Sequence, residues 1–277
     1  MTTTDRDRAI QQAVSDRYAG IAERQLATQT AEPGGLQFEM AATAAEAACC
    51  DDECCGDGTA EASPEEIRHA VKLYTDGEAL ASVPEGAVNA SLGCGNPVAI
   101  AELSAGERVL DLGSGGGIDC FIASKQVGPG GEVWGLDMTP QMIRLARRNA
   151  EQVDAANVQF RLGEIEDMPF EEGYFDAIIS NCVINLSTDK ARVFREAFRV
   201  LKPGGRLRVS DMVLTADLPE VEHADLSAWA GCIAGALPVE DYLDAVRAAG
   251  FADARADVSG DSRPGIASAY ITAVRPA

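Results

Sequence analysis

The stretch that most constrains the fold runs from Arg108 to Gly117 and reads Arg-Val-Leu-Asp-Leu-Gly-Ser-Gly-Gly-Gly. Apolar residues surround Asp111 and predict a short buried strand. Glycines then recur at every second position, at Gly113, Gly115 and Gly117. The next ten residues, 118–127, predict a helix. A strand, a glycine turn and a helix in this order begin a βαβ unit, whose turn lets a ligand approach the backbone and the helix N-terminus closely.

The spacing of these glycines indicates which ligand the turn binds. A dinucleotide fingerprint needs Gly or Ala at the sixth position of the turn, where this chain has Ile118. NAD and FAD therefore fit poorly. An acidic residue followed by alternating glycines is typical of sites for S-adenosylmethionine (AdoMet), whose ammonium group Asp111 can offset directly or through water. We predict AdoMet as the cofactor, with a glycine turn that binds nothing as the alternative.

Further candidate cofactor residues follow the ends of the next strands. A strand over 132–137 ends at Asp137, whose carboxylate can accept hydrogen bonds from both ribose hydroxyls. Met138 can pack on the adenine face. Strands over 158–162 and 175–181 bring their carboxyl ends to the same edge, where open α/β sheets bind ligands. The predicted cofactor-binding residues are Asp111, Gly113, Ser114, Gly115, Gly117, Asp137, Met138, Ile165, Glu166 and Asn181.

Alternating strands and helices predict a Rossmann-like α/β fold with a central, mostly parallel, seven-stranded sheet and helices on both faces. Further helices are expected over 1–30, 63–74, 140–153, 189–201 and 240–249, a turn at 202–205, and strands over 207–212, 254–258 and 267–274. The predicted parts are residues 1–63, an N-terminal helix and a mobile Cys-rich segment; 64–215, an AdoMet-binding domain; and 216–277, which completes the sheet and binds substrate.

The charge balance limits the partners and the compartment. The formal net charge is −21, which argues against a nucleic-acid or anionic-membrane partner. An acid-rich chain with few lysines suits a cytoplasm of high salt, where screening removes self-repulsion, so a halophilic source is our hypothesis. No signal peptide or apolar span is evident, and we expect a cytoplasmic location.

Eight cysteines in such a chain predict soft-metal ligands or redox thiols rather than a disulfide framework. Two vicinal pairs, Cys49-Cys50 and Cys54-Cys55, lie close together, and no second pair follows at zinc-finger distance. Single thiols stand before the first strand, after the fourth strand and in a later segment of small residues, at Cys94, Cys182 and Cys232. We interpret Cys120, on the helix after the glycine turn, as structural.

Linked motifs give a family resemblance. The glycine turn, Asp137-Met138, Gly163–Phe170 and Leu201–Gly205 together resemble class I AdoMet-dependent methyltransferases. More narrowly, the chain resembles arsenite methyltransferases at Gly93–Pro97, Asp119-Cys120, Asp137–Pro140, Ile179–Leu186 and Gly231–Leu237. The resemblance implies that AdoMet is the methyl donor and that arsenite or an arsenic–thiol conjugate is the acceptor. It also implies that the arsenic ligands are Cys94, Cys182 and Cys232, with one of Cys49, Cys50, Cys54 and Cys55 acting beside them.

The chemistry fits these residue types. Trivalent arsenic is soft and binds thiolates, and three sulfurs leave its lone pair directed at the methyl group. Attack needs no general base, because no proton leaves the nucleophile. Methylation oxidises the arsenic, so spare cysteines and a thioredoxin- or glutathione-type reductant would have to restore it. Two alternatives stay open: a methyltransferase acting on quinone or sterol carbon, and a metalloid-binding sensor or sequestering protein.

Overall fold

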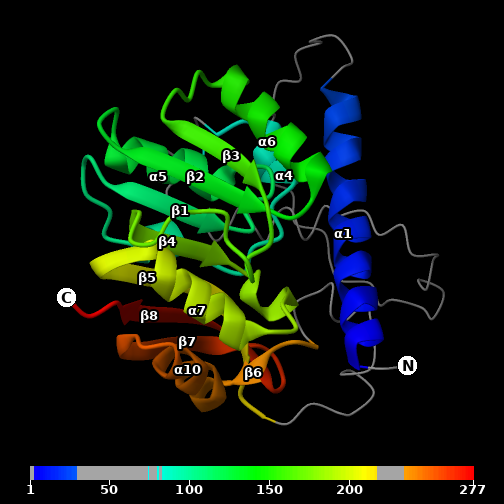
Figure 1. The fold of residues 1–277 in the computed structure, drawn as a ribbon. Helices are drawn as coiled ribbons and strands as arrows, with labels where there is room; N and C mark the ends of the chain where they lie inside the picture. Colours follow the sequence, from blue (N-terminus) through cyan, green and yellow to red (C-terminus); the bar gives the residue numbers. More distant parts are fainter. Residues whose placement is uncertain (1–2, 30–73, 75–79, 81–82, 217–233) are drawn as a thin grey trace, which may run out of the picture.

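A computed structural model describes residues 3–29, 74, 80, 83–216 and 234–277 of the chain. It shows a mixed sheet with helices against both faces (Figure 1). This confirms the prediction of a Rossmann-like α/β fold. The two cysteine pairs, Cys232 and the helix expected over 63–74 fall outside the described residues, apart from Tyr74.

In the described part of the chain, seven strands form the body of the sheet in the order β3-β2-β1-β4-β5-β8-β7. The parallel strands are β1 (Arg108–Leu112), β2 (Glu132–Asp137), β3 (Val158–Leu162), β4 (Phe175–Asn181) and β5 (Leu201–Leu214). Two antiparallel strands, β8 (Ile266–Val274) and β7 (Ala252–Arg263), complete it, and the short β6 (Leu237–Pro238) pairs with β5. The chain moves outward from β1 to β3 and then returns to β4. The order therefore reverses between β1 and β4, the point at which such sheets bind ligands.

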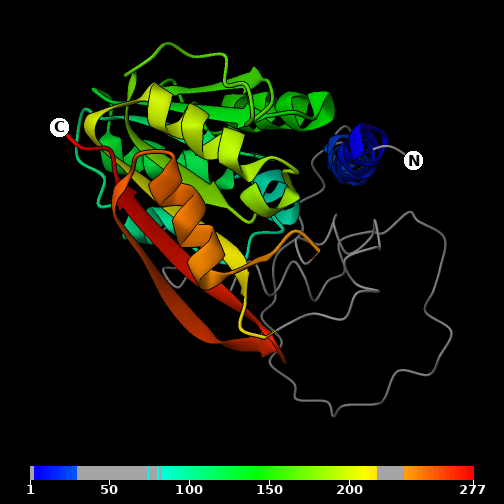
Figure 2. The same ribbon diagram turned by 60° about the horizontal axis from the view of Figure 1, so that its bottom comes forward.

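Helices cover both faces of the sheet and bury apolar side chains against it. One face carries α5 (Ile118–Val127), α6 (Pro140–Gln152) and the 3-10 turn η1 (Pro97–Ile100). The other carries α7 (Lys190–Val200) and α10 (Val239–Ala248), which lie side by side in Figure 2. Two short elements remain, α4 (Glu85–Asn89) and the 3-10 turn η2 (Ile184–Leu186).

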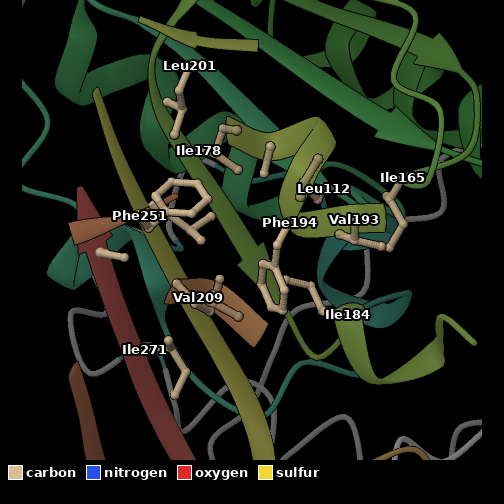
Figure 3. Close-up of a cluster of buried hydrophobic side chains, with 14 of the residues drawn as sticks. Leu112, Ile165, Ile178, Ile184, Val193, Phe194, Leu201, Val209, Phe251 and Ile271 are labelled. Carbon is tan, nitrogen blue, oxygen red and sulfur yellow. The ribbon is translucent and has the colours of Figure 1, made fainter. Parts of the chain in front are cut away.

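The larger core cluster lies between the sheet and the pair α7 and α10. Figure 3 shows Phe194 of α7 directed towards Ile184 and Val209, with Phe251 and Ile271 further along the same layer. All five side chains are buried. This packing fixes the ends of β4 and β5 relative to each other, which matters because the candidate site lies just beyond them.

The N-terminal helix α1 (Thr3–Thr28) stands apart from the sheet layers, beyond the carboxyl ends of the parallel strands (Figure 1). Its Ile21 and Ala22 pack against Met142 and Leu145 of α6. Further towards the N-terminus, an apolar group forms from Ile10, Val14, Met138 and Leu186. The predicted N-terminal helix is confirmed, and its buried apolar residues lie at the edge where the ligand is expected.

Two predicted boundaries were wrong. Residues 202–205 were expected to form a turn before a strand at 207–212, but β5 already begins at Leu201. Phe175 pairs with Leu201 and Ala177 with Arg206, so the intervening residues bulge from the ladder. The last-but-one strand, expected over 254–258, extends over 252–263 because it pairs along β8.

Among the described helices, none is both long and apolar enough to cross a membrane.

Candidate active site

A cavity lies at the carboxyl ends of β1 to β4, where the strand order reverses. Its empty volume, including the solvent at its mouth, is about 960 Å³. The walls come from the glycine turn, the residues after the strands, the segment 90–93 and α1. From α1 come Gln11, Val14 and Tyr18.

The glycine turn brings backbone to the cavity wall. Gly113 has a φ of +65°, and a Cβ there would lie 2.3 Å from Val183. Gly115 has a φ of +50° and faces open space. Both positions therefore need glycine, one for close approach and both for backbone conformation. The turn leaves room for a ligand at the N-terminal end of α5.

Asp137 fixes this turn from the end of β2. Its carboxylate accepts hydrogen bonds from the backbone N–H groups of Gly115 (3.0 Å) and Thr139 (2.8 Å). Burial raises the pKa of Asp137, and these two bonds act against the rise. The carboxylate is thus held rigidly at the cavity wall, where it can accept further bonds from ligand hydroxyls.

Two further buried carboxyl groups line the cavity. Asp119 accepts hydrogen bonds from the Tyr74 hydroxyl (3.0 Å) and the Asn181 amide (3.1 Å). Asp111 accepts one from the Cys120 thiol (3.2 Å). Burial raises the pKa of Asp119 to about 6, while burial and the nearby charge of Asp119 raise that of Asp111 well above its usual range.

This acidic pair suits a cationic ligand. Within the part of the chain that the structure describes, no lysine or arginine forms an ion pair with Asp111 or Asp119. Two buried acids without a cation are costly, and a ligand ammonium would offset that cost. The residues present therefore fit the amino-acid end of AdoMet.

A second feature adjoins the cavity, formed around Cys94. Its backbone N–H donates to Asn181 Oδ1 (3.0 Å), and its carbonyl accepts from the Ser268 hydroxyl (2.9 Å). The flanking glycines are required by close packing, because a Cβ at Gly93 would lie 2.4 Å from Asn181, and one at Gly95 would lie 2.0 Å from Ser210. The Cys94 thiol is therefore anchored over the ends of β4, β5 and β8.

Cys182 lies beside it, immediately after β4. Its φ is +60°, a left-handed conformation that a residue with a Cβ adopts at some energetic cost. Its N–H donates to the Ser210 carbonyl (2.8 Å), which holds the conformation. Sγ of Cys94, Sγ of Cys182 and a carboxylate oxygen of Asp211 all lie within 4.8 Å of one another. Among the described residues, neither cysteine forms a disulfide.

Asp211 is fully buried at the end of β5. Its carboxylate accepts hydrogen bonds from the Tyr242 hydroxyl and the Asn185 N–H, both at 3.2 Å. Burial raises the pKa of Asp211 to about 7, although the nearby Lys190 charge and the hydrogen bonds act against this. Burial and the Asp211 charge raise the pKa of Tyr242 well above its usual range.

The structure brings most of the predicted cofactor residues together. Nine of the ten line the cavity, and Gly117 does not. A Cβ at Gly117 would lie 2.8 Å from Phe160, so this glycine allows packing of the turn on the core. Met138 also packs against α1, and Glu166 accepts a hydrogen bond from Ser187. Of the predicted arsenic ligands, Cys94 and Cys182 lie together, while Cys232 and the four N-terminal cysteines fall outside the described residues.

Several residues at the site escaped the sequence reasoning. The α1 side chains in the cavity wall carry no local signature of ligand binding. Asp119 was noted only as part of a family-like segment, and Tyr74 as the end of an expected helix. Asp211 offered one usable signal, an acidic residue near the carboxyl end of the strand predicted over 207–212. Tyr242 reads locally as an ordinary helix residue.

Comparison with known proteins agrees with this geometry. A family model described as a methyltransferase domain matches residues 103–253. The chain is 47% identical over 206 residues to an arsenite methyltransferase of Halobacterium salinarum, covering 73% of this chain and 52% of that protein. It is 44% identical over 170 residues to an arsenite methyltransferase of Aquipseudomonas alcaligenes, covering 59% of this chain and 49% of that protein. The chain thus spans about half the length of these curated relatives.

Among solved structures, the chain is similar to an arsenic(III) S-adenosylmethionine methyltransferase from Chlamydomonas reinhardtii. The TM-score is 0.62 at 35% identity, and the match covers 78% of this chain and 74% of that one.

Proposed function

The chain belongs to the arsenite methyltransferases, a family of class I AdoMet-dependent methyltransferases, and on that basis we propose that it methylates trivalent arsenic held by its own cysteine thiols. The acceptor is arsenite or an arsenic–thiol conjugate, and the products are methylarsenicals.

The observation that carries the proposal is the pairing of Cys94 and Cys182. These residues lie far apart in the sequence, yet their sulfur atoms lie within 4.8 Å of each other. Their chain neighbours Gly93, Asn181 and Val183 line the cavity that suits AdoMet. A methyltransferase acting on an organic acceptor has no need for two cysteine side chains side by side at this place.

Each part of the site has a role in the proposed reaction. AdoMet, when bound, supplies a methyl group activated by its positively charged sulfur. The glycine turn, Asp137 and the acidic pair bind and orient that donor. Cys94 and Cys182 bind arsenic, with Cys232 as the proposed third ligand, so that the arsenic lone pair is directed at the methyl carbon. Catalysis then depends on alignment rather than proton transfer.

Turnover requires electrons as well as a methyl group. Transfer of CH₃⁺ to the lone pair raises arsenic formally from the trivalent to the pentavalent state. Two thiols that close to a disulfide return two electrons and release two protons. We assign this role to cysteines among Cys49, Cys50, Cys54 and Cys55, with a thioredoxin- or glutathione-type reductant reopening the disulfide.

The test is to incubate the full chain with AdoMet, arsenite and a thiol reductant, and to measure methylated arsenic and S-adenosylhomocysteine (AdoHcy) together. We expect both products in equal amounts, and loss of both in Cys182→Ser and Cys94→Ser. Turnover only with quinone- or sterol-type acceptors would refute the proposal, as would arsenic binding without any turnover.

Cys120→Ser is the matched control. Its thiol is also buried, and a serine hydroxyl can keep the bond to Asp111. This variant should bind arsenite as the unsubstituted chain does. If it loses arsenite as completely as Cys182→Ser, the effect of the cysteine substitutions is not specific to the thiol pair.

A further inference from the structure

A carboxyl group faces the thiol pair, and the proposed reaction assigns it no role. Asp211 lies near the carboxyl end of β5 and is fully buried. One of its oxygens lies within 4.8 Å of the sulfur atoms of both Cys94 and Cys182. Thiol, thiol and carboxyl thus enclose one small space at the ends of β4 and β5.

Hydrogen bonds from neighbouring residues hold the Asp211 carboxyl group in position. Oδ2 accepts both the Tyr242 hydroxyl and the Asn185 N–H, while Oδ1 accepts the N–H of the adjacent Met212 at 3.1 Å. Lys190, whose charge acts to lower the pKa of Asp211, donates to the carbonyls of Asn185 and Ser187. The three bonds that Asp211 accepts use both carboxylate oxygens, which an asparagine with its single acceptor oxygen could not match. A carboxylate has about four lone-pair sites, so one is left to accept a hydrogen bond from a ligand.

Two-thiol binding of arsenite leaves a group that this carboxyl can recognise. Arsenous acid reacts with two thiols to give (RS)₂As–OH. Two As–O bonds break, two As–S bonds form, and each thiol proton leaves with a hydroxide as water. Arsenic stays trivalent and keeps one hydroxyl. An organoarsenical such as phenylarsine oxide reacts with the same two thiols, but its remaining ligand is carbon, which offers no hydrogen bond.

We propose that Asp211 is the recognition residue for this remaining hydroxyl, so that the site distinguishes inorganic arsenite from organoarsenicals before a third thiol binds. The inference rests on the proposed function, because it takes Cys94 and Cys182 as the arsenic ligands. The carboxyl accepts a hydrogen bond from As–OH, while Tyr242 and Asn185 keep it directed at the two sulfur atoms.

The test uses the full chain with Cys49, Cys50, Cys54, Cys55 and Cys232 replaced by serine, so that only two site thiols remain. Arsenite and phenylarsine oxide binding are measured by equilibrium dialysis with elemental arsenic detection, in a phosphine reductant that supplies no competing thiol. Asp211→Ala and Asp211→Asn are compared with the parent. Asp211→Ala should bind arsenite about tenfold more weakly, the loss of one hydrogen bond to a charged group. Phenylarsine oxide affinity should change by less than about twofold, because its bound form has no As–OH group and so no hydrogen bond to Asp211 to lose.

Asp211→Asn provides the conservative comparison if the alanine variant does not fold. It keeps an acceptor oxygen, so its arsenite affinity should lie between those of the parent and the alanine variant. If the affinities for arsenite and phenylarsine oxide fall equally, the inference is overturned, and Asp211 only supports the thiols. Unchanged arsenite binding would also overturn it. If the parent fails to bind phenylarsine oxide, the thiol pair itself is wrong, and the proposed function fails together with the inference.

Discussion

Asn181 joins the cofactor cavity to the thiol pair, and its removal should damage both sites at once. Its amide oxygen accepts the N–H groups of Cys94 (3.0 Å) and Gly95 (3.3 Å). Its amide nitrogen donates to Asp119 (3.1 Å), to the Tyr74 hydroxyl (3.2 Å) and to the Gly95 carbonyl (2.8 Å). Asn181→Ala therefore removes five hydrogen bonds from a single half-buried side chain.

The size of the effect follows from the groups left behind. Three groups lose an important partner: the Cys94 N–H, the Gly95 carbonyl and the Asp119 carboxyl. At about 1 kcal/mol each, the free energy of unfolding should fall by roughly 3 kcal/mol. For a chain of this size, that corresponds to a melting temperature lower by roughly 6–12 °C. Because Cys94 loses its anchor, phenylarsine oxide affinity should fall by about tenfold, or about 1.4 kcal/mol.

The assay combines thermal unfolding with two binding measurements, AdoHcy for the cavity and phenylarsine oxide for the thiols. We expect Asn181→Ala to lower both affinities as well as the melting temperature. Asn157→Ala is the matched control, because Asn157 is also half-buried and bonds to Ser124 and Gly128, away from both sites. The control should lose stability and keep both affinities.

Two outcomes would refute this reasoning. Asn181→Ala could lose stability while both affinities stay within twofold, in which case Asn181 supports the fold but does not position Cys94. Alternatively, Asn157→Ala could lower both affinities as much as Asn181→Ala does, so that the loss of affinity would reflect general destabilisation.

Two further predictions concern solution conditions. AdoHcy affinity should rise about tenfold from pH 5 to pH 7, because Asp119, with a pKa of about 6, gains the charge that attracts the ligand ammonium. The ligand-free protein should lose stability over the same interval, since the folded state keeps a proton that the unfolded chain releases near pH 4. Titration calorimetry of Asp119→Asn should show a much flatter pH profile, and an unchanged slope would assign the effect to another group. The melting temperature should rise between low and molar salt. At a net charge of −21 the negative side chains repel one another, and salt screens this repulsion. A melting temperature that stays constant across that range of salt would contradict the halophilic hypothesis.

Much of the fold could be predicted from local patterns. The first strand lies where it was expected, and the boundaries of β2 to β4 and of α5 match the sequence prediction, because short buried strands and glycine turns have strong local signals. Strand ends that are set by pairing could not be predicted. β7 extends as far as β8 offers partners, and the bulge at 202–205 depends on the register between β4 and β5.

The sequence by itself determined the class of ligand and the chemistry of the site, because glycine spacing, Asp137 and soft thiols are properties of residues and short segments. Only the tertiary structure decided which groups meet. The pairing of Asn181 with Ser210 and the left-handed backbone at Cys182 bring that thiol beside Asp211 and Cys94. The packing of α1 on α6 closes the cavity with residues that carry no local signature. Such contacts depend on strand register and helix packing across the whole chain, which no local pattern records.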